Sequence, residues 1–148
     1  MNIDVKAEVV INRPKDDVAS FVMNADNDPD WIDGIVETET LTDQPLSVGT
    51  KVRRVAEFLG RRMECVPEVV EYEPGALLVM STDSPFQMTI RLEFEDADKG
   101  TLARIRIQGE GTGFYKLAGP MLANTIKRNV IKDLQTLKGI LESRGDEA

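Results

Sequence analysis

Residues 86–107 decide the fold, and they read FQMTIRLEFEDADKGTLARIRI. Apolar and polar side chains alternate on both sides of the turn-forming segment 97–100, which is typical of β-strands with one buried face. A turn at 97–100 pairs Phe94 with Ala103, and one face of the hairpin is then wholly apolar. A slip of one residue would mix the two faces, so the register is well determined. The hairpin predicts five further residues on the apolar face: Met88, Ile90, Leu92, Ile105 and Ile107.

The same alternation continues on the N-terminal side of this hairpin. Residues 3–11 alternate, and from residue 35 onward turn signals divide the chain into further strands. The turn signals fall near 43–45, 59–62, 73–75 and 83–85. Together with the hairpin, these segments predict a curved antiparallel sheet of seven strands, six of them in succession.

The turns determine which side chains of the central strands face inward. The turn at 59–62 suits a two-residue loop that begins with glycine, and this register pairs Phe58 with Met63. The register places Arg54 on an apolar face together with Val52, Ala56 and Phe58. The turn at 84–85 predicts that the same face continues through Leu77 and Val79.

Two features count against this register. It places Glu57 opposite Glu64, which is a cost because like charges then face each other across the strands. The turn at 73–76 does not keep the same parity. Either a β-bulge lies there, or the register at 50–73 is wrong by one residue.

Helical regions lie at both ends of the strand-rich segment. Pro14 suits the first position of a helix, and the polar, turn-rich residues 24–33 around Trp31 predict a second short helix and a loop. Over 115–143, apolar residues recur every three to four positions, which indicates a long amphipathic helix. Pro120 is expected to kink its first turns. The inward face of this helix includes Leu122, Ile126 and Val130.

Length and composition limit the possible functions. The 148 residues fit one domain spanning 1–148, and 41% of them are hydrophobic. The absence of histidine excludes an imidazole base, a Ser-His or Cys-His pair and a His-ligated zinc site. The single cysteine, Cys65, excludes an internal disulfide and a multi-cysteine metal site. We therefore expect neither a metal nor a cofactor.

The net charge of −8 argues against a nucleic-acid partner, because such proteins usually carry a basic face. The N-terminus has no signal-peptide pattern, and no apolar run approaches the ~20 residues of a membrane helix. We expect a cytoplasmic protein without stable membrane insertion, present as a monomer or weak homodimer.

The order of the predicted elements and several short sequence segments resemble those of the START / birch-pollen-allergen-like helix-grip superfamily, also called SRPBCC. Within it, the chain is most similar to the polyketide cyclase/dehydrase-like family of small bacterial proteins. The resemblance rests on 11–14, Val18, Phe21, Trp31, 48–50, 58–62, 70–75, 84–86 and 133–138. It implies an α+β helix-grip fold, in which a curved sheet wraps around the C-terminal helix and two short helices follow the first strand.

The resemblance also implies a hydrophobic cavity between sheet and helix, used for lipids, polyketides or other apolar molecules. The family shares no catalytic motif, so the resemblance names no catalytic residue. We expect the cavity wall to consist of Val52, Ala56, Phe58, Leu77, Val79, Met88, Ile90, Leu92, Ile105, Ile107, Leu122, Ile126 and Val130.

Several polar residues are candidates for contact with a ligand. Arg54, on the apolar face, could bind a carboxylate, phenolate or enolate, or it could instead reach solvent near the strand end. Tyr72 and Tyr115 could donate a hydrogen bond to a ligand carbonyl, although a rim position with a wet hydroxyl is the commoner role. Residues 26–37 mimic the acidic spacing of a calcium loop, but they lack its glycine, so these acids are interpreted as helix caps and solvated groups.

Three functions remain open on the sequence. The first is binding or transport of a hydrophobic small molecule, which is lipid- or polyketide-like. The second is a polyketide aromatase/cyclase-type enzyme, although no convergent acid and base groups are visible, so catalysis stays undecided. The third is a protein-interaction module that uses the loop around Trp31 or the helix surface. Buried titratable groups in one pocket would favour the enzyme, and a filled core would favour the interaction module.

Overall fold

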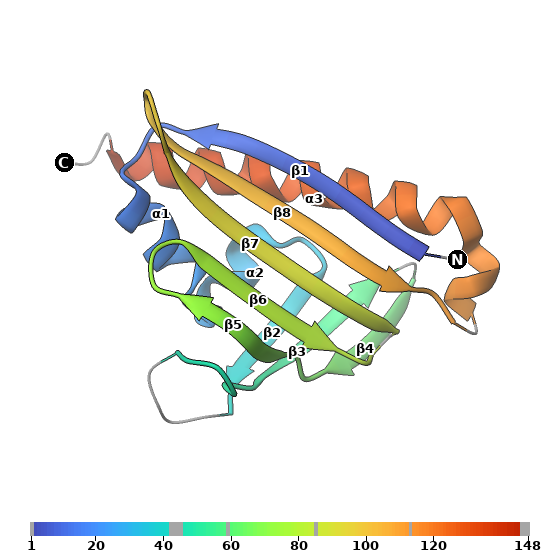
Figure 1. Cartoon of the computed structure of the whole chain (residues 1–148). Coiled ribbons are helices and arrows are strands. Elements are labelled where there is room, and N and C mark those ends of the chain that lie inside the picture. Colours follow the sequence, from blue (N-terminus) through green and yellow to red (C-terminus); the bar gives the residue numbers. More distant parts are fainter. Residues whose placement is uncertain (1, 42–45, 59, 85, 113, 146–148) are drawn as a thin grey trace.

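The computed structural model describes residues 2–41, 46–58, 60–84, 86–112 and 114–145, with the side chains of 2, 114, 115, 118–120 and 145 left out (Figure 1). The chain forms an α+β helix-grip fold, as the sequence predicts. The helical elements are α1 (Lys15–Val22), a 3-10 turn (Ala25–Asn27), α2 (Asp28–Trp31) and α3 (Phe114–Gly145). The strands are β1 (Asn2–Ile11), β2 (Ile35–Thr40), β3 (Val52–Phe58), β4 (Arg61–Cys65), β5 (Glu68–Glu73), β6 (Leu77–Thr82), β7 (Gln87–Ala97) and β8 (Gly100–Glu110).

The described part of the chain has eight strands instead of the predicted seven. The expected strand between the turns at 59–62 and 73–75 is divided at Val66 and Pro67 into β4 and β5. Proline lacks the N–H that a continuous ladder requires, which accounts for the break.

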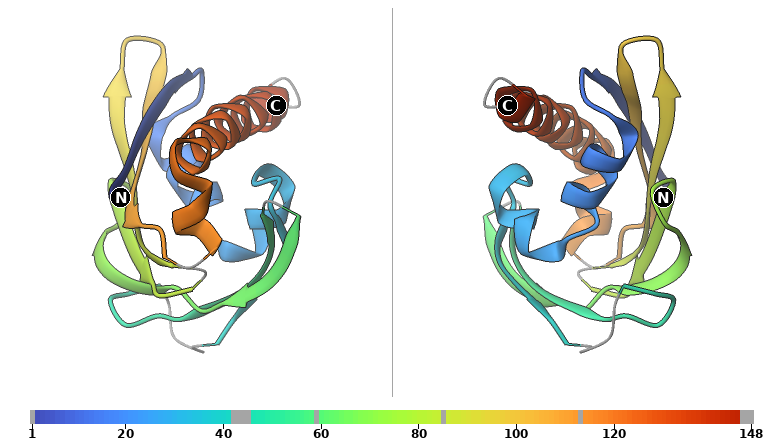
Figure 2. Two further views of the ribbon diagram at one scale, coloured as in Figure 1. Left: turned by 90° about the vertical axis from the view of Figure 1, so that its right-hand side faces the viewer. Right: turned by 90° about the vertical axis from the view of Figure 1, so that its left-hand side faces the viewer.

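The strands form two sheets, with the orders β1-β8-β7-β6-β5 and β2-β3-β4. A short seam joins them, where the backbone N–H of Gly49 and that of Val69 donate to the carbonyl oxygens of Val69 and Thr50 at 2.8 and 2.9 Å. Val52 N donates to the carbonyl oxygen of Pro67 at 3.1 Å. Viewed along the long helix, the two sheets curve around α3 and the short helices (Figure 2). This curvature is what leaves room for a site between sheet and helix.

The hairpin of β7 and β8 has the predicted register, with Phe94 opposite Ala103 and Met88 opposite Gly109. A Cβ atom on Gly109 would meet the carbonyl oxygen of Gln87, so only glycine allows this close approach. On the outer face, Arg106 pairs with Asp4 at 2.7 Å. Arg104 of β8 likewise meets Glu8 at 3.0 Å, so both arginines of this strand point away from the core.

The register of the β3–β4 hairpin differs from the prediction by two residues. Phe58 pairs with Arg61, and Ala56 pairs with Met63. The turn is thus one residue earlier, and Gly60 adopts a φ of 75° that suits glycine. Glu57 then lies opposite Arg62, so the like-charge clash disappears. A shift of two residues preserves the faces, so Arg54 still points inward.

A β-bulge, one of the two alternatives for the parity problem at 73–76, is present, but it lies within β5 and not at the turn. The pairing of β5 with β6 shifts between Val69 and Glu71. The prediction for the next turn was wrong: Leu78 lies opposite Leu92, and Met80 lies opposite Ile90. The inward face of β6 therefore carries Leu78, Met80 and Thr82, and the predicted Leu77 and Val79 lie on the other face.

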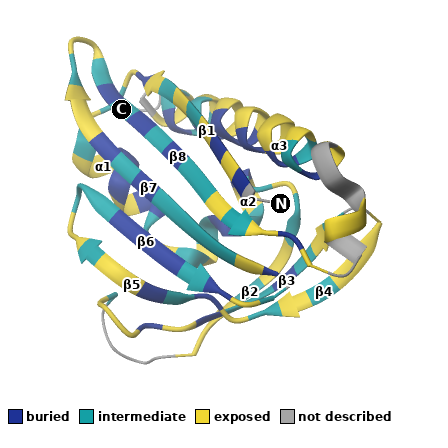
Figure 3. Cartoon of the chain, turned by 45° about the vertical axis from the view of Figure 1, so that its right-hand side comes forward, coloured by how far each residue is buried: buried dark blue, intermediate teal, exposed yellow. Residues whose placement is uncertain are grey.

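The long helix packs its apolar stripe against the inner surface of the sheets. The buried apolar side chains among the described residues of α3 are Leu122, Ile126, Val130, Leu134, Leu137 and Leu141. Figure 3 shows the buried positions of α3 turned toward the sheet and the exposed ones turned outward. The first turns of α3 lie at an angle to the rest (Figure 2), as expected for a helix with Pro120 near its start.

Candidate functional site

Two adjoining pockets lie between the sheets and α3, and they are named here as the two lobes of one cavity because they share lining residues. The first lobe, here the helix lobe, has a volume of about 160 Å³ and lies beside α1 and α2. The second, here the hairpin lobe, has a volume of about 180 Å³ and lies beside the β3–β4 hairpin. Seven residues line both lobes and form the waist between them: Ile32, Ile35, Arg54, Ile90, Ile107, Val130 and Asp133.

Both lobes are mainly apolar. Beyond the waist, the helix lobe is lined by Val22, Met23, Ala25, Asp28, Trp31, Leu46, Val52, Leu78, Met80, Leu92 and Ile105. The hairpin lobe is lined by Gly34, Ala56, Glu57, Phe58, Met63, Cys65, Pro67, Thr82, Phe86, Met88, Ile126 and Asn129. Glu57 and Asn129 are exposed, so the hairpin lobe reaches the surface between β3 and α3.

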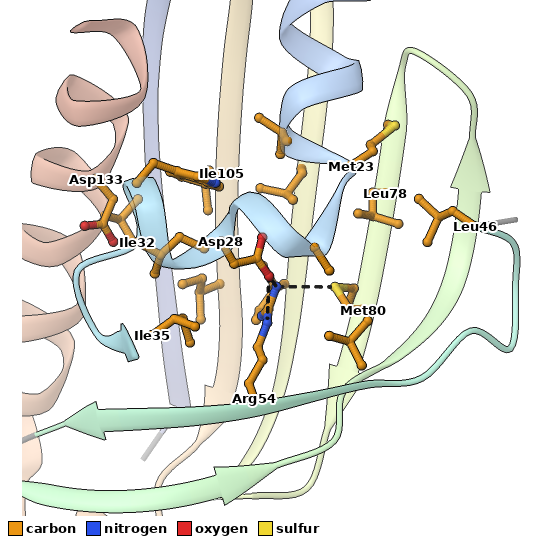
Figure 4. Close-up of a pocket in the computed structure, with 18 residues that line it drawn as sticks. Met23, Asp28, Ile32, Ile35, Leu46, Arg54, Leu78, Met80, Ile105 and Asp133 are labelled. Carbon is orange, nitrogen blue, oxygen red and sulfur yellow. Dashed lines mark hydrogen bonds and ion pairs between the residues drawn. The ribbon is translucent and has the colours of Figure 1, made fainter. Parts of the chain in front are cut away.

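A buried ion pair lies where the lobes meet. Arg54 extends from β3 to Asp28 at the start of α2 (Figure 4). Its Nε and Nη2 donate to Asp28 Oδ2 at 3.1 and 2.6 Å. The side chain of Arg54 is 11% exposed and that of Asp28 is 3% exposed. Because both charged groups are buried, the attraction between them is what offsets the loss of their hydration.

The guanidinium of Arg54 keeps hydrogen-bonding capacity beyond this pair. Nη2 also approaches the Met80 sulfur at 4.0 Å, whereas the described residues accept no hydrogen bond from Nη1. Burial raises the pKa of Asp28, and the nearby Arg54 charge opposes that rise. The pair therefore presents little net charge to the cavity but still offers N–H donors.

Asp133 brings a second carboxyl to the waist from α3. It is 6% exposed, and its Oδ1 accepts a hydrogen bond from the backbone N–H of Asp33 at 3.2 Å. Burial raises the pKa of Asp133 to about 6, with the Asp33 charge adding to the rise. A buried carboxyl with this pKa can donate or accept a proton near neutral pH.

The structure brings most of the predicted wall residues to the cavity. Val52, Leu92 and Ile105 line the helix lobe. Ala56, Phe58, Met88 and Ile126 line the hairpin lobe, and Arg54, Ile90, Ile107 and Val130 form part of the waist. Contact of these residues with a ligand remains a prediction.

Three predicted wall residues do not line either lobe in the described structure. Leu122 is buried in the core. Leu77 and Val79 face away because the register of β6 differs from the prediction, and Leu78 and Met80 take their places. The side chain of Tyr115 lies outside the described residues.

The sequence reasoning missed the two carboxyls of the site. Asp28 was interpreted as a solvated loop acid, but it is 2% exposed. A signal existed, because an arginine on an apolar face needs a counterion. Asp133 lay within the predicted helix, at a position where its helical face overlaps the apolar stripe.

The remaining candidate residues lie at positions that give little support for a chemical role. Cys65 lines the hairpin lobe, where burial raises the pKa of its thiol and so disfavours the thiolate. Tyr72 is half-buried against the core, away from both lobes. Trp31 is 3% exposed and lines the helix lobe, so its own side chain offers little surface to a protein partner.

The described residues contain neither a cluster of metal-ligating side chains nor a helix that could span a membrane. No three His, Cys, Asp or Glu side chains come together there as a metal site. No helix in that part of the chain is long and apolar enough to cross a membrane.

Comparison with known proteins identifies the family. The model of the family "Polyketide cyclase / dehydrase and lipid transport" matches residues 2–142. Among curated proteins, none matches the chain in sequence.

Solved structures share the fold at low sequence identity. The Zhui aromatase/cyclase from a Streptomyces strain is 17% identical, with a TM-score of 0.81 over 97% of this chain and 96% of its own. A START superfamily protein from Mycobacterium smegmatis is 15% identical, with a TM-score of 0.81 over 95% and 97% of the two chains. The protein TTHA0849 from Thermus thermophilus is 17% identical, with a TM-score of 0.80 over 95% and 98%. The fold and the match along nearly the whole chain agree: this protein belongs to the polyketide cyclase/dehydrase and lipid transport family.

Proposed function

We propose that this chain binds a hydrophobic small molecule in the two-lobed cavity. The observation that carries this proposal is a mainly apolar cavity that keeps a few polar groups at its waist. Small-molecule sites are typically concave and apolar, with a small number of placed polar groups. The family description, which includes lipid transport, supports the same class of ligand.

The single tryptophan provides a direct test. Trp31 lines the helix lobe, so a ligand in that lobe changes the surroundings of the only indole in the chain. We expect the emission of Trp31 to shift and saturate when fatty acids, long-chain alcohols or polycyclic ketones are titrated. Native mass spectrometry should give a matching stoichiometry of one.

A cavity-filling variant separates binding in the cavity from binding at the surface. Ala56 lines the hairpin lobe, so Ala56→Phe should weaken binding at least ten-fold. Glu39→Phe adds the same ring at an exposed position of β2 and serves as the control. Equal affinities of the two variants, or no saturable binding by the wild-type protein, would contradict the proposal.

A second candidate function is an aromatase/cyclase-type enzyme, and Asp133 is the observation that favours it. Its carboxyl titrates at about pH 6 in the same cavity as the N–H donors of Arg54. Such a pair could supply a proton and stabilise an enolate during an intramolecular aldol condensation that ends in loss of water. The similar Zhui protein is named an aromatase/cyclase.

Turnover of a bound polyketone distinguishes the two functions. An enzyme should convert it to a product lighter by one water, and Asp133→Asn should abolish conversion while leaving the affinity within about three-fold. A bound polyketone that is recovered unchanged would leave the binding function alone. The interaction module is less favoured, because it predicts a filled core and the cavity is open.

A further inference from the structure

The polar groups of the cavity lie at its middle, which constrains the ligand. Arg54 and Asp133 line both lobes, so a ligand group that reaches them lies between the two apolar spaces. In the hairpin lobe, the Thr82 hydroxyl is already engaged, since it donates to Ser84 O at 3.0 Å. Glu57 and Asn129 lie at the exposed mouth of that lobe. The polar function of the ligand should therefore be internal to the molecule and not at its buried end.

The charges at the waist argue against an anionic ligand. Asp28 already holds Arg54 through two hydrogen bonds to one carboxylate oxygen. A ligand carboxylate would add a further negative charge beside Asp28 and Asp133, among walls that are mainly apolar. An uncharged oxygen avoids this cost and can still accept a hydrogen bond from Nη1 of Arg54, which donates to no described residue.

The lobe volumes constrain the two arms. The lobes measure about 160 and 180 Å³, and an apolar cavity of ~150 Å³ is known to take one benzene molecule. Each lobe thus accommodates a group of about one ring.

We infer that the ligand is an uncharged molecule with two apolar, ring-sized arms joined at a carbon that carries a carbonyl or hydroxyl oxygen. One arm occupies the helix lobe and the other occupies the hairpin lobe, and the oxygen lies beside Arg54. This inference rests on the proposed binding function and names the ligand class for that same site.

Matched diphenyl compounds test this inference by calorimetry. Benzophenone and benzhydrol carry a central oxygen, diphenylmethane lacks it, and biphenyl-4-carboxylate places a charge at one end. We expect benzophenone or benzhydrol to bind at least ten-fold more tightly than diphenylmethane and than the carboxylate. One hydrogen bond from the charged guanidinium of Arg54 accounts for a preference of this size.

A double variant tests whether the waist is the source of the preference. Arg54→Met with Asp28→Leu replaces both partners by apolar side chains and leaves no unpaired charge. We expect this variant to bind benzophenone and diphenylmethane within about three-fold of each other. Asp17→Asn, at an exposed position of α1 away from the cavity, is the control and should keep the wild-type preference.

The possible outcomes distinguish a failure of the inferred ligand class from a failure of the proposed binding function. If diphenylmethane binds as tightly as benzophenone, or if the carboxylate binds most tightly, the inference is wrong and the cavity still binds hydrophobes. If only long-chain compounds bind, the inference that the ligand has two ring-sized arms is wrong. If no compound of either panel binds, both the inference and the proposed function fail. The wild-type series decides these cases even if the double variant does not fold.

Discussion

Two arginine–aspartate pairs show how differently the two sheets are built. In the five-stranded sheet, Arg106 and Asp4 meet at 2.7 Å on the outer face, with 38% and 44% of their side chains exposed. In the three-stranded sheet, Arg54 reaches inward and meets Asp28 at 2.6 Å, with 11% and 3% exposed. The same two residue types thus form a solvated contact on one side of the molecule and a buried pair that lines the cavity on the other.

The comparison indicates that the five-stranded sheet mainly stabilises the fold, whereas the three-stranded sheet carries the charged pair of the cavity. In the five-stranded sheet, β8 forms long, regular ladders with β1 and β7, and its arginines face their acidic partners on the outer surface. The three-stranded sheet has shorter strands and carries the charge that shapes the cavity. Buried ionic groups generally cost stability, so the sheet that carries one is expected to give up some stability for recognition.

Removal of one partner of the buried pair should have the largest effect. Arg54→Ala leaves the carboxyl of Asp28 buried without a counterion, so we expect a loss of about 3 to 5 kcal/mol in the free energy of unfolding. Urea denaturation at neutral pH measures this loss. The double variant Arg54→Met with Asp28→Leu should recover most of it. A loss below about 1 kcal/mol in the single variant would contradict the buried pair.

The next effect concerns pH and Asp133. The pKa of Asp133 is about 6 in the folded protein, above the ordinary value of 3.8. Between these two pH values, the folded state therefore binds the proton of Asp133 more strongly than the unfolded state does. The free energy of unfolding should therefore fall as pH rises from about 4 to about 6, by up to roughly 3 kcal/mol, and this contribution should be constant above that range.

Asp133→Asn should reduce this fall and raise stability at a pH of about 7.5, because it removes a buried charge while an amide oxygen can still accept from Asp33 N. Asp33 and Lys132, the other charged groups beside Asp133, are 76% and 66% exposed in their side chains. Asp33→Asn is therefore the control and should leave most of the slope. Identical pH profiles for Asp133→Asn and the wild-type protein would show that Asp133 is not buried as described.

Two glycines compare how tightly the sheets are packed. A Cβ at Gly109 in β8 would collide with the backbone of Gln87, so Gly109→Ala should cost about 1 to 3 kcal/mol. A Cβ at Gly34, next to β2, would lie 3.3 Å from Glu57 O, which asks for only a small movement. Thermal denaturation should show the larger loss for Gly109→Ala. The reverse order would mean that the cavity side is the less adaptable one.

The smallest effect is expected for the exposed pair. Arg106→Ala removes an ion pair that water already screens, so its denaturation midpoint should differ little from that of the wild-type protein. Any difference should disappear at about 1 M salt, where the screening length is ~3 Å. A loss as large as that of Arg54→Ala would remove the distinction between the two sheets.

The sequence predicted best where one face had to be wholly apolar. In the β7–β8 hairpin, a single register satisfies this condition, and the pairing of Phe94 with Ala103 is confirmed. Between β6 and β7, a two-residue turn was assumed, whereas residues 83–87 separate the paired Thr82 and Met88. A connection with an odd number of residues, instead of two, turns the other set of β6 side chains inward. No local sequence pattern predicts how many residues the connection has.

The site was predicted only in part, because its polar contacts join distant segments. Arg54 and Asp28 are 26 residues apart in the chain, and Asp133 meets Asp33 across 100 residues. Apolar wall positions follow from the alternation of each strand. A contact between an arginine on a strand and an acid in a short helix follows only from the packing of the whole molecule.

The seam between the sheets has a mechanical consequence. Long ladders resist bending across their strands, whereas three backbone hydrogen bonds around Gly49, Val52 and Val69 hold the two sheets together. The helix lobe has walls on both sides of this line, with Val52 from β3 and Leu78 from β6. Bending along the seam changes the distance between these walls without breaking a ladder. The spacing of these two walls is therefore held, where the sheets meet, by three backbone hydrogen bonds and not by a full ladder.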